Sequence, residues 1–293
     1  MTTTPINHST KTRIAPTPSG FLHLGNVLSF VITAALAYKS GAKILLRIDD
    51  LDQPRVNKAY LQDIFDTLYF LKISWDEGPR SAEEFEDAYS QVHRIVLYNQ
   101  ALTYLADNNL VFACNCSRNS LNTESCNCVA KQLPLDTANA SWRLITDDNT
   151  VIHIKGHNNH TINATLPAEM HNFIIKKKDG YPAYQLTSMI DDLFYGIDLI
   201  VRGEDLWPST LAQHQLALAL GKTTFSDIVF YHHPLINDAA GAKLSKSAGA
   251  TSVKYLRENG KTAGDIYTMI AGAMGINKVI SDWKQLAGVL LNH

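Results

Sequence analysis

A short apolar segment, a glycine-containing turn and a long apolar helix open this chain, and this order most constrains its fold. Arg13-Ile14-Ala15 is typical of a strand, Gly20 and Gly25 mark the turn, and residues 24–38 predict a helix. Such a turn directs backbone N–H groups and the positive end of a helix toward a phosphate group. We therefore expect an α/β fold that binds a phosphorylated ligand where the first strand ends.

Lys243-Leu244-Ser245-Lys246-Ser247, much later in the chain, is a second candidate phosphate-binding segment. Two lysines and two serines stand there in a loop flanked by glycine and alanine. A flexible ammonium group can follow reacting phosphates, so Lys246 is the candidate contact. The alternative is a solvated surface lysine, which is more typical of an isolated Lys-x-x-Lys sequence. The presence of both segments in one chain favours a nucleotide site.

Strands and helices alternate over most of the chain, which predicts a parallel sheet covered by helices. Helical periodicity extends over residues 59–71, 83–107, 186–195 and 209–220. Strand-like segments lie at residues 44–48, 199–201 and 229–231.

Between residues 111 and 180 the pattern changes to short strand-like segments separated by turns rich in Asn, Asp and Gly. These segments lie at residues 142–145, 151–154 and 173–175. We expect four parts: the first half of an α/β domain at 1–110, an inserted subdomain at 111–180, the second half with the lysine segment at 181–250, and a tail of short helices at 251–293.

Length and composition exclude several classes of protein. With 293 residues, of which 45% are hydrophobic, the chain can bury a large core, and a net charge of −2 gives no global sign of nucleic-acid binding. No apolar stretch is long enough to span a membrane, and residues 1–12 do not resemble a signal peptide. We expect a cytoplasmic protein, and a monomer.

All four cysteines lie close together in the sequence, as Cys114, Cys116, Cys126 and Cys128. In a reducing compartment such an even cluster favours metal binding over disulfides, and four thiolates can complete a tetrahedral zinc site of the structural kind. The single-residue gaps differ from the common Cys-x-x-Cys spacing, so reduced cysteines without a metal are the alternative.

Arg13 to Gly20, followed by His23-x-Gly25-Asn26, resembles the opening of glutamyl-tRNA synthetases. The two phosphate-binding segments are similar to the HIGH and KMSKS signatures of class I aminoacyl-tRNA synthetases. The blocks at 47–52, 184–186 and 200–205 follow in the family's order. The resemblance implies a Rossmann-type class I catalytic domain (α/β), an inserted zinc-bearing subdomain of the acceptor type and a short helical C-terminal tail.

The resemblance also implies the site residues. Catalytic roles fall on His23, Asn26, Lys243 and Lys246, ATP contacts on His23, Gly25 and Lys246, and a glutamate pocket on Arg13, Ile14, Ala15, Pro16, Thr17, Asp49, Tyr184 and Arg202.

Three positions depart from the usual pattern of the family. Asn26 replaces a second histidine, Thr17 a serine, and Asp49 a glutamate that would pair with the α-ammonium group. Arg202 would bind the γ-carboxylate, because a guanidinium group matches a carboxylate with two hydrogen bonds. The alternative roles are structural, as a core side chain for Tyr184 and a strand-end cap for Asp49.

The cofactors and partners expected by resemblance are structural zinc, Mg-ATP as substrate, L-glutamate and a tRNA. Relatives bind zinc through Cys-x-Cys and later ligands, one of which is a tyrosine in some of them. In glutamyl-tRNA synthetases a large anticodon-binding region follows the lysine segment, whereas here His293 ends the chain soon after Ser247. This difference and the cysteine cluster resemble the glutamyl-Q branch of the family, which attaches glutamate to the queuosine base of tRNA(Asp).

Three other activities stay open at this point. An atypical glutamyl-tRNA synthetase would charge tRNA(Glu), a small-molecule nucleotidyltransferase would ignore RNA, and a regulatory paralogue would lack the chemistry. The stretch with His153, His157 and His160 favours a polar surface turn over a second metal site. The run 176–178 of three lysines fits either an RNA contact or a solvated hairpin turn.

Overall fold

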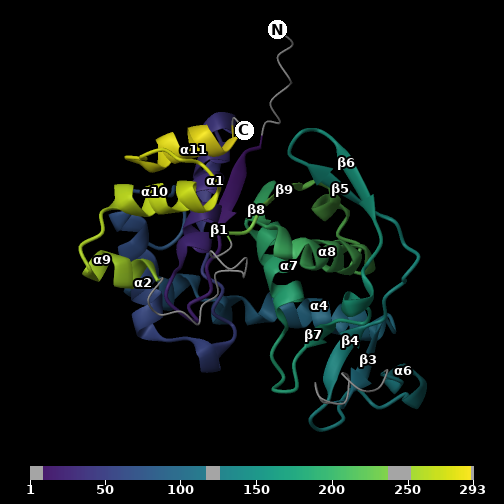
Figure 1. Cartoon of the computed structure of the whole chain (residues 1–293). Coiled ribbons are helices and arrows are strands. Elements are labelled where there is room, and N and C mark those ends of the chain that lie inside the picture. Colours follow the sequence, from purple (N-terminus) through teal and green to yellow (C-terminus); the bar gives the residue numbers. More distant parts are fainter. Residues whose placement is uncertain (1–8, 117–125, 237–251, 292–293) are drawn as a thin grey trace. The chain divides into compact units, whose positions relative to one another are not determined.

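The computed structural model describes residues 9–116, 126–236 and 252–291 (Figure 1). The chain forms two compact units. The first comprises Met1–His93, Ile197–Asp205 and Val229–His293, and the second comprises Arg94–Gly196 and Leu206–Ile228. Among the described helices, none has the length and apolar character needed to cross a membrane.

A parallel sheet forms the centre of the first unit, as the sequence predicted. Strand β1 (Lys11–Ile14) lies between β2 (Lys43–Leu46) and β8 (Leu199–Gly203), and β9 (Val229–His233) pairs with β8 on its other side. Because these strands run in the same direction, their carboxyl ends meet at one edge of the sheet. Ligands of open α/β sheets bind at this edge.

Helix α1 (Leu24–Ser40) confirms the predicted apolar helix and is largely buried. Val27, Leu28 and Val31 have no exposed surface, which explains why apolar residues occupy nearly the whole circumference of this helix. The helix ends at Gly41, whose φ of 75° places it in the left-handed region that glycine adopts without strain.

The remaining helices of the first unit pack around this core. They include α2 (Lys58–Phe70), α9 (Val253–Glu258), α10 (Ala263–Ala273) and α11 (Trp283–Leu291), with the 3₁₀ turn Gln53–Arg55. The 3₁₀ turn Glu204–Leu206 lies where the chain passes from this unit to the second. The expected helical tail is confirmed, and Figure 1 shows α10 and α11 beside α1. The Tyr267 hydroxyl of α10 donates to the carbonyl of Leu71 at 2.5 Å and so fixes the tail to the end of α2.

The predicted continuous helix over residues 83–107 is wrong, because the chain breaks at Ser90. The Ser90 hydroxyl donates to Asp50 Oδ2 at 2.5 Å, and the Gln91 N–H donates to Asp50 Oδ1 at 2.8 Å. The buried carboxylate thus takes a backbone donor that a helix would otherwise use. The resulting elements are α3 (Ala82–Glu84), a π-helical turn (Phe85–Tyr89), a 3₁₀ turn (Gln91–Arg94) and α4 (Ile95–Asp107).

The second unit contains a small antiparallel sheet and a hairpin. The sheet has the order β3 (Val111–Cys114), β4 (Ser141–Leu144) and β7 (Ile174–Lys176), and the hairpin joins β5 (Ile152–Gly156) to β6 (Thr161–Ala164). The predicted strands near 142, 151 and 173 are confirmed within two residues, whereas β3 and β6 were not predicted. The helical elements are α4, α6 (Cys128–Lys131), α7 (Tyr184–Phe194) and α8 (Trp207–Ala219), with 3₁₀ turns at Ala168–Met170 and Thr223–Asp227.

A buried ion pair joins α4 to α7 within this unit. Arg94 donates through Nε and Nη2 to the two carboxylate oxygens of Asp191 at 2.9 and 3.0 Å, and the Tyr98 hydroxyl donates to the same carboxylate at 2.6 Å. The Asp191 side chain has no exposed surface. The three hydrogen bonds supply the interactions that a buried carboxylate needs.

Replacing Arg94 by leucine should lower the free energy of unfolding by about 3–5 kcal/mol, because it leaves the Asp191 carboxylate buried without its cation. Urea unfolding followed by circular dichroism would measure this. Lys58→Ala is the matched control, since Lys58 forms an exposed ion pair with Glu86 at 3.6 Å. Equal effects of the two substitutions would contradict the assignment.

Candidate functional site

Side chains of the first candidate phosphate-binding segment cap the amino end of α1. His23 Nδ1 accepts a hydrogen bond from the Gly25 N–H at 3.1 Å, and Asn26 Oδ1 accepts one from the His23 N–H at 3.0 Å. This is a capping box, which satisfies two of the N–H groups that a helix start leaves without partners. The first turn contains no acidic residue, so nothing in it opposes an anion.

The capping box fixes the chemical character of both side chains. Because Nδ1 accepts, the hydrogen of the neutral His23 ring lies on Nε2, which is therefore a donor. The carbonyl oxygen of the Asn26 side chain accepts from the backbone, so a ligand would meet this side chain through the hydrogen-bond donors of its NH₂ group. A Cβ atom at Gly25 would lie 3.1 Å from the His23 ring, so glycine keeps this ring in place.

The lysine candidates of the second segment, Lys243 and Lys246, lie outside the described residues. The described chain resumes at Ser252, which forms an antiparallel bridge with His23. The next residue, Val253, donates its N–H to the Leu22 carbonyl at 2.7 Å, and the Lys254 ammonium lies over the Phe21 ring at 4.7 Å. The chain that follows the lysine segment is thus attached to the start of α1.

Two buried arginines occupy the sheet at the same edge. Arg13 is 5% exposed and Arg202 is 4% exposed. Arg13 Nη1 donates to the carbonyl of Val201, the residue before Arg202, at 3.2 Å, and the Arg202 guanidinium lies over the Phe230 ring at 5.4 Å. Both cations stand near the carboxyl ends of parallel strands, where a carboxylate ligand would find two guanidinium groups.

Asp49 has a neighbour that sequence reasoning did not include. Arg47 donates from Nε and Nη2 to Asp49 Oδ1 and Oδ2 at 2.8 and 3.0 Å, and both side chains are buried. Asp49 is therefore part of a bidentate ion pair at the end of β2. The spacing Arg-x-Asp after a strand was a possible signal, because it places both side chains on one face.

The other predicted pocket residues lie in both units. Ile14 ends β1 and is 1% exposed, and residues 15–17 follow it directly, with Pro16 accepting the Asp49 N–H at 3.0 Å. Tyr184 is the first residue of α7 in the second unit and is 41% exposed, so its predicted contact with a substrate stays a prediction. The first unit alone brings together Arg13, Asp49 and Arg202.

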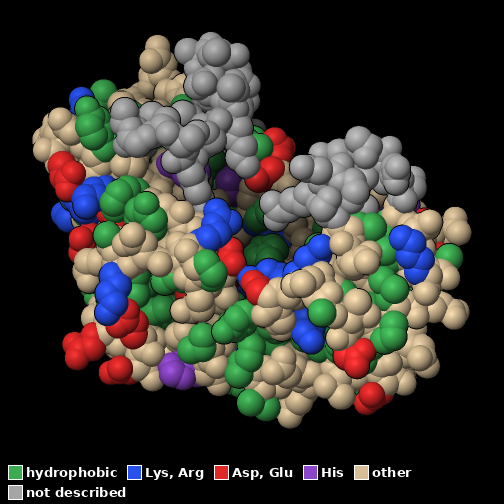
Figure 2. All heavy atoms as spheres, turned by 90° about the horizontal axis from the view of Figure 1, so that it is seen from below, with side chains coloured by type: hydrophobic (Ala, Val, Ile, Leu, Met, Phe, Trp, Pro, Cys, Tyr) green, Lys and Arg blue, Asp and Glu red, His purple; other side chains and the backbone are tan. Residues whose placement is uncertain are grey.

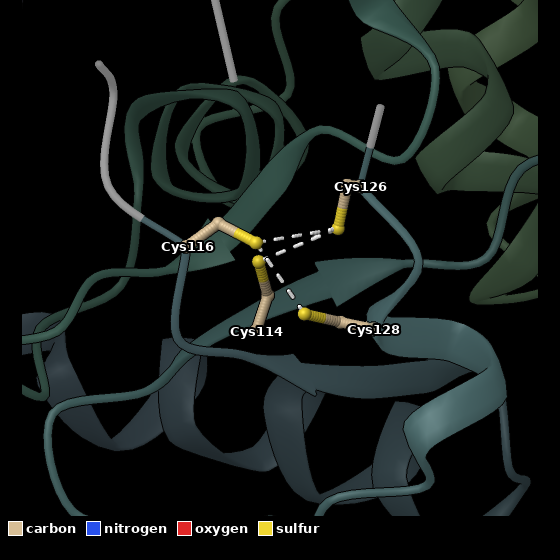
Figure 3. A group of neighbouring side chains, drawn as sticks. All are labelled: Cys114, Cys116, Cys126 and Cys128. Carbon is tan, nitrogen blue, oxygen red and sulfur yellow. Dashed lines mark hydrogen bonds between the residues drawn. The ribbon is translucent and has the colours of Figure 1, made fainter. Parts of the chain in front are cut away.

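The four cysteines form a cluster in the second unit (Figure 3). The Sγ–Sγ separations are 3.7 Å for Cys114–Cys126, 3.9 Å for Cys116–Cys126 and 3.5 Å for Cys116–Cys128. A tetrahedron of sulfur atoms ~2.3 Å from a central Zn²⁺ has edges of about 3.8 Å. All four Sγ atoms lie within 4.8 Å of one another, so the cluster has the size and donor set for a metal ion.

The ionisation of the thiols also fits a metal site. Although burial raises it, the pKa of Cys114 lies at about 7, because the Cys116 backbone and the Arg143 guanidinium stabilise its thiolate. The hydrogen bond with Cys128, together with burial, raises the pKa of Cys116 to about 12. Four adjacent thiols cannot all ionise against their mutual repulsion, and a divalent cation removes that obstacle.

The lysine run beside this cluster is held by protein contacts. The Lys176 ammonium lies over the Trp142 ring at 4.1 Å, Lys177 pairs with Asp179 at 2.9 Å, and Lys178 donates to the Asn115 carbonyl at 3.0 Å. Figure 2 shows cationic and anionic side chains interspersed on the face in view. These contacts favour the hairpin turn over an RNA contact for this run of lysines.

The histidine-rich stretch forms the β5–β6 hairpin. His153 Nδ1 lies 2.7 Å from Asn163 Oδ1, and the His160 ring packs over Gly156, where a Cβ atom would approach it to 2.8 Å. Within the part of the chain that the structure describes, the cysteines alone form a group of three or more metal-ligating side chains at binding distance. The interpretation as a surface turn fits these contacts.

The comparisons with known proteins agree with this geometry. Residues 9–276 match the model of the family described as tRNA synthetases class I (E and Q), catalytic domain. This chain belongs to that family. The predicted class I synthetase fold and the expectation of a synthetase-type ligase are confirmed.

Relatives of this class I synthetase include proteins of two names. Glutamyl-Q tRNA(Asp) synthetase of Synechococcus sp. (strain CC9605) is 33% identical, and the match covers 96% of this chain and 88% of that protein. Glutamate–tRNA ligase 2 of Syntrophus aciditrophicus (strain SB) is 32% identical over 86% of this chain, but this chain spans 55% of that protein.

A solved structure supports the same fold. The glutamate–tRNA synthetase of Elizabethkingia anophelis superimposes with a TM-score of 0.72 over 95% of this synthetase and 65% of that chain. Because the two sequences are 21% identical, this comparison supports a similar fold and nothing beyond it.

The cysteine cluster should bind one equivalent of Co²⁺, used as a spectroscopic probe, and the complex should show the absorption of a tetrahedral thiolate site. Cys114→Ser should abolish this spectrum, because it removes one ligand. The matched control is His160→Asn in the β5–β6 hairpin, which should leave the stoichiometry at one. An unchanged spectrum in Cys114→Ser would contradict the assignment of the site.

Proposed function

We propose that this chain activates L-glutamate with ATP to form glutamyl-adenylate and then transfers glutamate to the queuosine base of tRNA(Asp). The observation that carries the first half is the pair of buried guanidinium groups, Arg13 and Arg202, at the sheet edge of the unit that also presents the capped start of α1. Two positive charges that can bind an acidic amino acid thus lie at the carboxyl edge of the sheet. The start of α1, the helix that follows the first strand of this sheet, suits a phosphate group.

In the first step an α-carboxylate oxygen of glutamate attacks the α-phosphorus of ATP, and the bond to pyrophosphate breaks. The step needs no covalent enzyme intermediate, so positioning and charge stabilisation supply the catalysis. Nε2–H of His23, the amide NH₂ of Asn26 and the backbone N–H groups of α1 are the donors for the phosphate oxygens. Lys243 and Lys246 are further proposed donors to the phosphate oxygens, and this role rests on the sequence alone.

The pocket would recognise glutamate through both ends of the molecule. The Arg202 guanidinium binds the γ-carboxylate, and Arg13 adds a second positive charge nearby. The Asp49 carboxylate, oriented by Arg47, binds the α-ammonium group, and a hydrogen bond from Tyr184 is proposed on the sequence resemblance alone. The backbone and side chains of Ile14, Ala15, Pro16 and Thr17 line the pocket, with Gly25 leaving space for ATP.

In the second step a nucleophilic group of the acceptor attacks the acyl carbon of the adenylate, and AMP leaves. The choice of queuosine in tRNA(Asp) is supported by the relative named glutamyl-Q tRNA(Asp) synthetase, whose match covers 96% of this chain. The glutamate–tRNA ligases support a second candidate, the charging of tRNA(Glu). We propose that the chain acts as a monomer. We also propose the domain division expected from the sequence, with parts at residues 1–110, 111–180, 181–250 and 251–293.

Zn²⁺ is the metal that we propose for the cysteine cluster, with Cys114, Cys116, Cys126 and Cys128 as ligands. Closed sites of four thiolates are typical of structural zinc. The ion would join the end of β3 to the start of α6 and take no part in the reaction. Mg²⁺ enters only with ATP, as part of the substrate.

A transfer assay with labelled glutamate tests the proposed function. Glutamate and ATP should give labelled tRNA(Asp) when the tRNA carries queuosine and no labelled product when it lacks queuosine. Label on the 3′ end of tRNA(Glu) would favour the second candidate, and ATP–pyrophosphate exchange without any RNA product would favour a small-molecule nucleotidyltransferase. Absence of glutamate-dependent exchange would contradict the proposed activation of glutamate by this chain.

Arg202→Gln should lower kcat/KM for glutamate in the exchange reaction by about 10²–10³-fold, because a neutral amide cannot replace a buried charge-assisted pair. The KM for ATP should stay within a factor of about two. Arg55→Gln is the control, since this arginine is exposed on the same unit. A similar loss for both variants would refute the role of Arg202.

A further inference from the structure

His233 ends strand β9 and is buried, with 2% of its surface exposed. Its Nδ1 lies 2.8 Å from the carbonyl oxygen of Pro234, and its Nε2 lies 2.5 Å from Ser29 Oγ on α1. A carbonyl oxygen only accepts hydrogen bonds, so the ring hydrogen lies on Nδ1. Nε2 is therefore the acceptor, and the Ser29 hydroxyl donates to it.

The surroundings keep this imidazole neutral. Burial lowers the pKa of His233 and outweighs the Pro234 carbonyl and the carboxylates of Asp205 and Glu204, which favour the charged form of the ring. A neutral ring retains the lone pair on Nε2 that the Ser29 hydroxyl needs. The hydrogen bond between β9 and α1 is thus present at neutral pH.

Ser29 lies in the second turn of α1, on the same side as two residues of the nucleotide-binding segment. It follows Gly25 by four residues and Asn26 by three, and residues at these intervals are neighbours on a helix surface. The hydrogen bond between Ser29 and His233 therefore restrains the turn of α1 that carries Gly25 and Asn26. The serine contacts no residue of the proposed glutamate pocket in the described hydrogen bonds.

The segment after His233 is also fixed on its other side. A Cβ atom at Gly203, the residue after Arg202, would lie 2.9 Å from Leu235 Cδ2 and 2.5 Å from Asp205 Oδ1. The last residue of β8 therefore packs closely on the residues that follow β9. The end of β9 lies between the first turns of α1 and the end of β8, which carries Arg202.

We propose that His233 is a positioning residue, whose neutral imidazole holds the first turns of α1 against the end of β9 and so places the nucleotide-binding groups of α1. This inference rests on the proposed ATP-dependent activation of glutamate. It assigns His233 no contact with the substrates. The hydrogen bond acts through Ser29 on the position of Gly25 and Asn26.

ATP–pyrophosphate exchange with the full chain at saturating glutamate tests the inference. Ser29→Ala should raise the KM for ATP by about 5- to 50-fold, because it removes the donor and leaves Nε2 of His233 buried without one. The KM for glutamate should change by less than about two-fold. Ser29→Thr keeps the hydroxyl and should restore the KM for ATP.

Two further variants separate positioning from general stability. Ser40→Ala removes a hydroxyl from the other end of α1, where it donates to the Leu36 carbonyl at 2.9 Å, and should leave the KM for ATP unchanged. His233→Asn should resemble Ser29→Ala, and the double variant should be no worse than either alone, since both remove one interaction.

The outcomes distinguish the inference from the proposed function. Wild-type protein without glutamate-dependent exchange would reject the proposed function itself. Active wild-type protein with an unchanged KM for ATP in Ser29→Ala would overturn the role of His233. A loss of stability with equal effects on the ATP and glutamate KM values would overturn it as well, because a merely structural bond has no preference between substrates.

Discussion

Strand β1 is hydrogen-bonded on both sides, and the proposed site depends on this central position. β2 and β8 run parallel to it, so residues after Ile14, Leu46 and Val201 reach the same edge of the sheet although they lie far apart in the sequence. The helix that follows β1 begins at that edge as well. A single pairing pattern therefore places the helix start that we propose for phosphate binding and a set of charged side chains within one unit.

Charged groups at this edge are buried at a cost that hydrogen bonds and ion pairs offset. Arg47 and Asp49 neutralise each other with two hydrogen bonds, and Arg13 donates to a backbone carbonyl. Isolated burial of such charges would be strongly unfavourable. The pairs hold the side chains in fixed orientations before a substrate arrives, which is what catalysis by positioning requires.

Much of this architecture follows from local patterns in the sequence. The apolar run from Leu24 predicted α1 and the clustering of the four cysteines predicted a metal site, because each depends on residues close in the sequence. The break at Ser90 was not predictable, since it depends on Asp50, forty positions earlier. The partner of Asp49 was missed for a different reason: the resemblance assigned its carboxylate to the α-ammonium group of the substrate, whereas in the structure it accepts two hydrogen bonds from Arg47. Strand β6 escaped prediction because Asn163 and Ala164 are residue types depleted in strands, and none of its four residues is buried.

Asn26 in the capping box changes the meaning of its departure from the family's signature. A histidine at this position would keep a donor for the nucleotide, but its ring offers a different acceptor geometry to the His23 N–H. The amide oxygen accepts the hydrogen bond at the helix start, and the amide nitrogen is the donor that we propose for the nucleotide. Substitution at this position is thus constrained by how the helix begins as well as by the proposed contact with the nucleotide, and the reaction chemistry alone does not contain the first of these demands.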